Sequence, residues 1–270
     1  MPYVSYNNIR AFLSNGDSQS LSTDSYNILY ATNFSASNTT QLKRVKRIGQ
    51  QLEYYIQTGP KSASISTSVI PVTGAGFNQF TGFLALTGDF TSGSYIQVPN
   101  YRFDKCFLKS FGFSLEPWKP VTVEMQFDSY GMATGNGIVP YASQDASQTG
   151  VVSPLRGVSV TITAANFTQG INQYENLNFN VEVDRAANFE IGQIYPTKVS
   201  ASKITKSLQI NGISNAEWLS DYEPNTTVSV TVGMPDGNSF SVAGVLSSQS
   251  LSVDGNGVAK GGLQIIEEMV

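Results

Sequence analysis

The amino-acid sequence predicts an all-β, mainly antiparallel fold of two tandem β-sandwich or half-barrel domains, with at most a short helix each. Three observations carry this prediction. Apolar and polar residues alternate with the period of two that is typical of strands with one buried and one wet face. Turn signals recur roughly every 10 to 15 residues. The tripeptide Ile48-Gly49-Gln50 returns in the second half as Ile191-Gly192-Gln193.

The clearest predicted element is a hairpin over residues 106–128. Apolar residues in its second strand alternate with polar ones: Val121, Val123, Met125 and Phe127 with Thr122, Glu124, Gln126 and Asp128. Proline lacks the N–H that a strand ladder needs, so Pro117 and Pro120 belong in the connection between the two strands. The polar residues are therefore expected to share one face of the hairpin.

The first 70 residues contain one ambiguous segment. Residues 1–24 are predicted as an N-terminal arm and residues 26–34 as a strand. Residues 42–56 have apolar residues at helical spacing, but Gly49 weakens a helix by about 1 kcal/mol. We predict that they are extended, because their counterpart in the repeat, residues 188–195, has no helical period.

Composition shifts divide the chain into parts. A first β domain is predicted over residues 25–135, with a loop rich in glycine and aromatic residues inserted at 71–102. Residues 136–154, rich in Gly, Ser and Gln, are predicted as a linker. Residues 155–270 are predicted as the second β domain, with strands at 158–163, 177–184, 228–232, 251–253 and 263–266 and a short helical turn near 215–219.

The internal repeat extends beyond the tripeptide. Lys109-Ser110, Trp118 and the strand at 121–127 resemble, in the same order, Lys206-Ser207, Trp218 and the strand at 228–232. Gly49 and Lys109 are 60 residues apart but Gly192 and Lys206 only 14, so the first copy would carry a long insertion, largely the aromatic loop. These matches predict a duplication.

Composition argues against several classes of function. The net charge of -4 and the 13% of charged residues disfavour binding of nucleic acid by bulk charge. Histidine is absent, which removes the commonest general base and metal ligand. Together with the lack of a phosphate-binding loop or nucleophile motif, this predicts a protein that is not an enzyme and needs no cofactor. The single cysteine, Cys106, is predicted to be a buried free thiol.

Neither a signal peptide nor an apolar stretch of membrane-spanning length is found in the sequence. Synthesis in a reducing cytoplasm, with no membrane partner, is therefore expected.

Two further groups of residues are candidate contact sites. Lys43, Arg44, Lys46 and Arg47 are four cations in five residues. They could contact nucleic acid, but a charged edge strand that discourages pairing, or a basic patch facing an acidic neighbour, is favoured. The aromatic residues of the inserted loop are expected to pack on their own domain or on a neighbouring subunit: Phe77, Phe80, Phe83, Phe90 and Tyr95.

Two stretches resemble a known family. Phe107-Leu108-Lys109-Ser110-Phe111-Gly112-Phe113-Ser114 with Pro120-Val121-Thr122-Val123-Glu124, and Asn188-Phe189-Glu190-Ile191-Gly192-Gln193 with Tyr195-Pro196, are similar to virion structural proteins of tailed bacteriophages, the tail tube proteins in particular. In that family two sheets form a small sandwich, inner sheets of neighbours join round a channel, and loops and arms link stacked rings. One unit per chain and hexameric rings are usual. A tandem chain implies a trimeric ring with pseudo-sixfold symmetry, or a ring of six with decorating second domains.

The resemblance implies a tail tube subunit located in the virion tail after synthesis in the host cytoplasm. Its partners would be further copies of itself and the sheath, tape measure, baseplate and neck proteins, with DNA only in transit. An acidic lumen is expected, lined by Thr122, Glu124, Gln126, Asp128, Glu182 and Asp184. Glu182 and Asp184 are interpreted as polar strand surface and not as an acid/base pair. The alternatives are a neck, terminator or baseplate-hub protein with the same fold, and a β-sandwich receptor- or carbohydrate-binding module.

Overall fold

The structure is a computed structural model that describes residues 10–15, 29–46, 48, 53–69, 94–98, 101–117, 119–134, 158–164, 167–191, 193, 195–214, 223, 225–233, 239–253 and 259–269. These residues form thirteen strands and no helix, so the all-β prediction is confirmed. The predicted linker at 136–154 and the helical turn near 215–219 lie outside the described residues. The strands are β1 (Arg10–Asn15), β2 (Leu29–Lys46), β3 (Glu53–Val69), β4 (Ser94–Val98), β5 (Tyr101–Leu115), β6 (Thr122–Thr134), β7 (Ser159–Ala164), β8 (Phe167–Ile171), β9 (Asn176–Asn188), β10 (Lys198–Ser214), β11 (Thr227–Gly233), β12 (Ser239–Val253) and β13 (Ala259–Met269).

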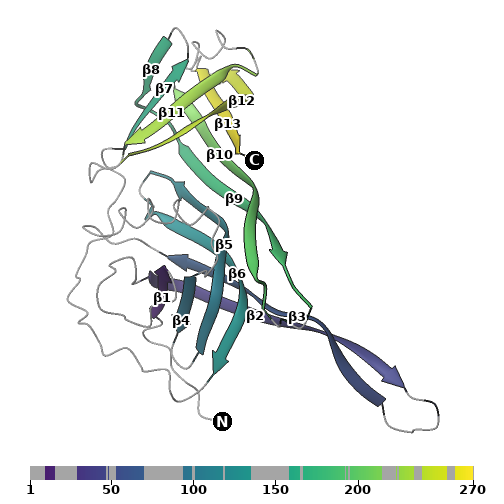
Figure 1. The fold of residues 1–270 in the computed structure, drawn as a ribbon. Coiled ribbons are helices and arrows are strands. Elements are labelled where there is room, and N and C mark those ends of the chain that lie inside the picture. Colours follow the sequence, from purple (N-terminus) through teal and green to yellow (C-terminus); the bar gives the residue numbers. More distant parts are fainter. Residues whose placement is uncertain are drawn as a thin grey trace.

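All thirteen strands belong to one antiparallel sheet with the order β4-β1-β2-β3-β6-β5-β9-β10-β13-β12-β11-β7-β8 (Figure 1). An additional pairing between β4 and β5 closes the first six strands on themselves. β5 also pairs with β9, and this pairing joins the N-terminal half of the sheet to the C-terminal half. The two halves therefore share a continuous ladder of backbone hydrogen bonds.

The predicted hairpin over residues 106–128 is confirmed and consists of the second part of β5 and the first part of β6. The two strands are antiparallel, with Phe113 opposite Val123 and Phe111 opposite Met125. Pro117 and Pro120 lie in the connection, as their missing N–H groups require. A β-bulge between Leu108 and Ser110 leaves Lys109 as the extra residue of β5.

Two long hairpins have distal parts that extend past the rest of their own half of the sheet (Figure 1). The first is β2–β3, whose distal part, residues 42–57, we call the first arm. The ambiguous segment lies here, and for its described residues 42–46 and 53–56 the extended conformation is confirmed by antiparallel pairs that continue to Lys46 opposite Glu53. The second is β9–β10, whose distal part, residues 184–203, we call the second arm. In this arm the pairing continues to Asn188 opposite Lys198.

Segments predicted as an arm and a loop contribute to the sheet. Residues 10–15 of the predicted N-terminal arm form β1, which pairs with β4 over four residues and with β2 over two. The end of the predicted loop at 71–102 forms β4 and the start of β5, which pair with each other. Short strands at the margin of a sheet carry little periodicity, so the sequence pattern did not distinguish them from loops.

One apolar core lies behind the sheet and includes side chains of both halves. Its largest fully buried members include Phe111, Phe127, Leu177 and Ile210. β4, β7, β8 and β11 also contribute buried residues to this core, among them Ile96 and Ile162. Cys106 is buried as a free thiol, as predicted, and its Sγ lies 3.2 Å from the carbonyl oxygen of Phe103.

The second part of the predicted repeat is wrong in its placement. Lys109 lies on β5, between β6 and β9, whereas Lys206 lies on β10, between β9 and β13. Likewise, the strand at 121–127 is β6, between β3 and β5, but the strand at 228–232 is β11, between β12 and β7. The matched strands thus have different neighbours in the sheet, and the alternation that they share does not indicate which strand lies beside them.

Candidate functional site

One face of the eight central strands is lined mostly by polar side chains. These strands are β2, β3, β6, β5, β9, β10, β13 and β12, in sheet order. We call this surface the polar face. Its members include Ser35, Ser37, Ser64, Ser66, Glu124, Gln126, Ser110, Ser114, Asn178, Asn180, Gln209, Asn211, Gln264, Ser248 and Ser250, which alternate with the residues that face the core. This alternation of polar and buried residues is typical of a sheet with one face exposed to solvent.

Hydrogen bonds between side chains connect neighbouring strands across the polar face. The hydroxyl groups of Ser35 and Ser66 lie 2.7 Å apart and link β2 to β3. Asn211 Nδ2 donates to Asn176 Oδ1 at 2.8 Å and links β10 to β9. Ser248 donates to Gln264 Oε1 at 3.4 Å and links β12 to β13. The face is therefore a polar surface of short, mutually bonded side chains.

A groove of about 630 Å³ opens on the polar face where β5, β6 and β9 meet. Five of the six residues predicted to line a lumen border this groove: Thr122, Glu124, Gln126, Glu182 and Asp184. The sixth, Asp128, lies further along β6 on the same face and is partly buried. The structure thus brings together residues from β6 and β9 that are far apart in the sequence.

The groove and its surroundings carry an excess of negative charge. Glu124, Glu182 and Asp184 border it, with Lys109 as the one cation among its lining residues. Lys203 and Lys260, from neighbouring strands, each form an ion pair with a carboxylate of their own, Glu268 at 2.8 Å and Glu175 at 2.7 Å. The hydrogen bond from Lys203 to Glu268 raises the pKa of this lysine and so favours its charged form. Each of these two cations is thus paired with a carboxylate outside the groove lining, although Lys203 also lies opposite Asp184.

The junction of β5 and β9 creates the groove. Residues 110–115 of β5 pair with residues 177–182 of β9, which places Phe113 opposite Phe179 and Leu115 opposite Leu177. These four side chains are buried on the core side. Gly112 leaves room for β9, since a Cβ at this position would lie 3.0 Å from the carbonyl oxygen of Phe179. Apolar packing on the core side and a glycine on the polar face thus allow the two halves of the sheet to join.

The second arm also docks on the first half of the sheet. Arg185 Nε donates to the carbonyl oxygen of Leu108 at 2.8 Å, and the guanidinium lies 5.7 Å from the centre of the Phe107 ring. Tyr130 of β6 contacts Phe189 edge-on, with 6.1 Å between ring centres. Burial raises the pKa of Tyr130, the nearby Asp128 raises it further, and Arg185 partly opposes the shift.

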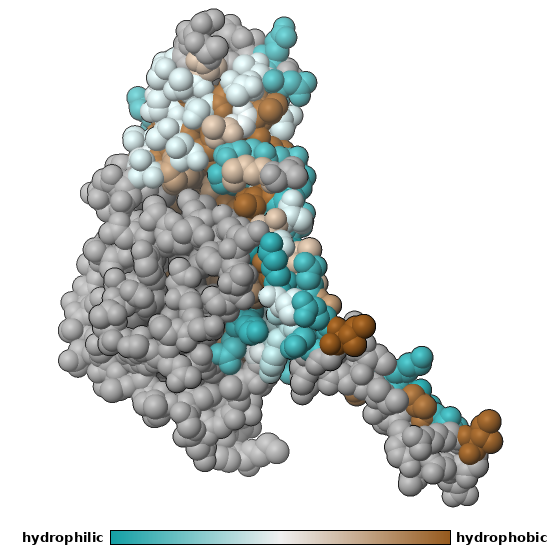
Figure 2. Space-filling model, viewed as in Figure 1, coloured by the Kyte–Doolittle hydropathy of each residue, from teal (hydrophilic) through white to brown (hydrophobic). Residues whose placement is uncertain are grey.

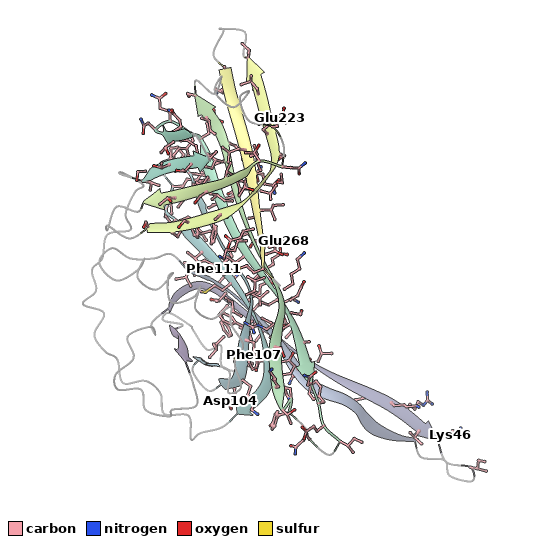
Figure 3. All side chains as sticks on the ribbon, turned by 45° about the horizontal axis from the view of Figure 1, so that its top comes forward. Lys46, Asp104, Phe107, Phe111, Glu223 and Glu268 are labelled. Atoms are coloured by element: carbon pink, nitrogen blue, oxygen red, sulfur yellow. The ribbon has the colours of Figure 1, made fainter. Side chains whose placement is uncertain are left out.

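The first arm carries the predicted basic cluster. Lys43, Arg44 and Lys46 lie near the end of β2 with exposed side chains, and Lys46 marks the far end of the projecting hairpin in Figure 3. Arg47 lies outside the described residues. Leu42 and Ile48 expose apolar surface on the same arm, where Figure 2 shows apolar atoms beside hydrophilic ones. Such a projecting arm suits contact with another molecule.

The aromatic contact residues predicted in the inserted loop fall largely beyond what the structure describes. Tyr95 lies on β4, and the other four, Phe77, Phe80, Phe83 and Phe90, lie outside the described residues. Three exposed apolar side chains of β12 were not predicted as contact residues: Val245, Leu251 and Val253. Leu251 and Val253 alternate with serine, as in an ordinary half-buried strand, and they are exposed because no described strand pairs with that part of β12 on its outer edge.

Few features of the described residues indicate a catalytic or metal-binding site. Within them, no three His, Cys, Asp or Glu side chains gather as a potential metal site. This part of the chain also contains no helix with the length and apolar character needed to cross a membrane. No protein-family model matches the chain, and no curated protein sequence matches it either.

Proposed function

We propose that this chain is a structural subunit of a phage tail tube, which forms stacked rings around a channel for DNA and has an acidic lumen. One observation carries the proposal: eight adjacent strands present a continuous polar face, backed by one apolar core. A tube wall needs such a sheet, because its inner surface is wet while its outer side packs on the rest of the subunit.

The chemistry of the polar face suits a channel for DNA. The polar face consists mainly of neutral serine, asparagine and glutamine side chains, several of which bond to one another. Few cations are therefore present to hold phosphate groups. The carboxylates of Glu124, Glu182 and Asp184 add a negative potential that repels the phosphate backbone. DNA would therefore pass through such a lumen without sticking to its wall.

The two arms suit contacts between subunits. The second arm already packs on the first half of the same chain through Arg185 and Phe189. The first arm projects with Leu42, Ile48 and its lysines exposed, as expected of an element that packs on a neighbour in the same ring or the next.

Imaging of the purified protein tests the proposal directly. We expect negative-stain micrographs to show rings or tubes, and cryo-electron microscopy to place Glu124, Glu182 and Asp184 on the inner surface. Capped or single rings would favour a neck, terminator or baseplate-hub position. A protein that remains monomeric at high concentration, or an inner surface measured to be basic, would overturn the proposal.

Thiol labelling locates the polar face independently. Because Cys106 is buried, the variant Gln126→Cys introduces one accessible thiol in the groove. In assembled particles, a maleimide-linked gold cluster at this position should appear inside the channel. The matched control is Glu223→Cys, an exposed position before β11 that lies outside the polar face (Figure 3). Gold at position 126 on the outer surface of the particle would contradict the assignment of the polar face to the lumen.

A further inference from the structure

The two halves of the sheet have the same strand order. In the first half, the strands follow one another as β1, β4, β5, β6, β3 and β2. In the second half, the order is β7, β11, β12, β13, β10 and β9. Each strand thus has a counterpart at the same place in the chain order and in the sheet, with β8 as an addition next to β7. This agreement extends over every strand of the first half.

Irregular positions in the strands agree as well. β5 has a bulge between Leu108 and Ser110 where it pairs with β6, and β12 has one between Leu246 and Ser248 where it pairs with β13. Once these bulges are aligned, the row of paired residues Leu108, Phe127, Ile65 and Ala36 corresponds to Leu246, Ile265, Leu208 and Phe179. Bulges are specific features of a strand, so their agreement fixes the correspondence residue by residue.

The repeated tripeptide agrees with the same correspondence. Ile48 lies between β2 and β3, and Ile191 lies between β9 and β10, which are counterpart hairpins. Both isoleucine side chains are fully exposed. The most distinctive sequence match therefore falls on equivalent ends of the two arms.

The junction inside the chain involves one edge of β5. Residues 101–106 of this edge pair with β4, and residues 110–115 pair with β9. Phe113 and Leu115 are thereby buried against Phe179 and Leu177, each at most 6% exposed. The second half of β5 is a docking edge for the outer strand of the next unit.

The counterpart of this docking edge on β12 is open. β12 pairs with β11 through residues 239–245, and Leu246 bonds to the backbone of Asn225 and Thr226, so in the described part of the chain no strand lies beside residues 247–253 on that edge. Leu251 and Val253 correspond to Phe113 and Leu115, yet they are 50% and 66% exposed. Leu251 and Val253 are thus exposed to solvent, although the equivalent side chains at the internal junction are buried.

The counterpart of β9 is open too. Among the described residues, no strand pairs with the outer edge of β2 beyond Tyr30. Phe34 and Ala36 correspond to Leu177 and Phe179, but Ala36 is exposed and Phe34 is only half-buried, against Phe103. The outer edge of β2 therefore lacks the covering that β5 supplies to β9.

We infer that a second copy of this chain closes these edges: residues 248–253 of β12 pair antiparallel with residues 34–39 of β2 in the neighbouring copy. The register of the internal junction places Val253 opposite Phe34, Leu251 opposite Ala36 and Ser252 opposite Ser35. The polar face then continues from one chain to the next, and the exposed apolar pairs become covered on the core side. This inference deepens the proposed function and rests on it for the identity of the partner as another copy.

The proposed contact is heterologous, since different edges of the two copies meet. Repeated around an axis, such a contact closes into a ring or runs into an open helix. Within a ring every junction, internal or between chains, would have the same geometry, so a ring of these chains has twice as many equivalent units as chains. The first arm of one copy would lie over Val245 of the next, as the second arm lies over the corresponding Phe107 within the chain.

Oxidative cross-linking tests the register. The double variants Ala36→Cys/Leu251→Cys and Ser35→Cys/Ser252→Cys should give ladders of covalent dimers and higher multimers in assembled protein. The matched control Asn33→Cys/Ser250→Cys is four residues out of register, about 13 Å at ~3.3 Å per residue, too far for a disulfide. Particles that form without cross-linking of either in-register pair would overturn the inference while the proposed function survives. Cross-linked chains that never form tubes or rings would support the edge pairing and overturn the tube.

A charge test uses positions that are exposed in the single chain. Leu251→Lys/Val253→Lys should shift the protein from assemblies to single chains in sedimentation velocity, by placing two cations in the new ladder. Ser241→Lys is the control, because it is an exposed residue in the part of β12 that already pairs with β11. An unchanged melting temperature of single chains would show that the double variant is folded, and unchanged assembly would overturn the inference.

Discussion

Phe113 of β5 and Phe179 of β9 lie directly opposite each other where the two halves of the sheet meet, with 5.2 Å between their ring centres. Both rings also contact Phe240 of β12, at 5.4 Å and 4.9 Å. This group holds the junction from the core side, while the groove with Glu124 and Glu182 opens on the other side. The stability of the junction and the shape of the polar face therefore depend on the same strand pair.

Phe179→Ala is expected to lower the free energy of unfolding by about 3–5 kcal/mol, because it leaves a cavity among three aromatic rings. Chemical denaturation followed by fluorescence measures this loss. The control Asn178→Ala changes an exposed side chain on the same strand and should stay within about 0.5 kcal/mol. Equal effects of the two substitutions would mean that the junction does not depend on aromatic packing.

Gly112→Ala tests the close approach of β5 and β9. The added Cβ would lie 3.0 Å from the carbonyl oxygen of Phe179 and 3.1 Å from Asn180 Oδ1, so β9 must shift. A loss of about 1–3 kcal/mol in the free energy of unfolding is expected, as for other overpacked sites. Ser114→Ala, two residues along the same face, is the control and should be close to neutral. A Gly112→Ala protein as stable as the parent would show that the junction yields to the extra methyl group.

Two ion pairs on neighbouring strands should differ in their contribution to stability. Lys206 and Glu267 are 2.8 Å apart with side chains 19% and 17% exposed, and Glu267 also accepts a hydrogen bond from the backbone N–H of Ala243. Lys206→Met leaves a partly buried carboxylate and should cost about 1–3 kcal/mol. Lys203→Met removes the more exposed pair with Glu268, whose charges are screened by solvent, and should cost less. Urea denaturation of both variants compares them, and a larger loss for Lys203→Met would contradict this ranking.

Stability should fall at alkaline pH in part through Tyr130 and Tyr174. Burial raises the pKa of both phenols in the folded chain above their ordinary value near 10. The unfolded chain therefore releases these protons first, so the stabilisation is complete below about pH 10 and is lost as pH rises through the folded pKa values.

Urea denaturation at several pH values between 8 and 11 measures this loss. The double variant Tyr130→Phe/Tyr174→Phe should show a shallower decline, because its phenylalanine rings carry no proton. The same slope in the parent and the double variant would assign the alkaline loss to other groups, such as the lysines in ion pairs.

Much of the fold could be predicted from local patterns. Alternation between Val121 and Asp128 indicated both the strand and its two faces, and the structure confirms this with Val123, Met125 and Phe127 buried. The repeat correctly indicated that residues 42–46 and 53–56 are extended. The second part of the repeat failed at Lys109 and Lys206, because alternation shows which face a residue occupies but not which strand lies beside it.

The groove could be predicted only in part. Glu124 and Glu182 were both expected on a polar face, but 58 residues separate them in the sequence and no pattern indicated that β6 and β9 lie on either side of β5. The exposed edge of β12 was missed for a related reason. Leu251 and Val253 look like core residues in sequence, and they are exposed only because no strand of the described chain lies beside them.

The sequence by itself determined most of the strands, their buried and wet faces, the connection with Pro117 and Pro120, and the matching tripeptides at Ile48 and Ile191. These features depend on side-chain periodicity and on proline and glycine, which act within a few residues. Only the tertiary structure decided the strand order, the pairing of one edge of β5 with both β4 and β9, and the two open edges on β2 and β12. Backbone hydrogen bonds are nearly the same for every pair of strands, so partners are chosen by long-range packing of the core, as between Phe113 and Phe179.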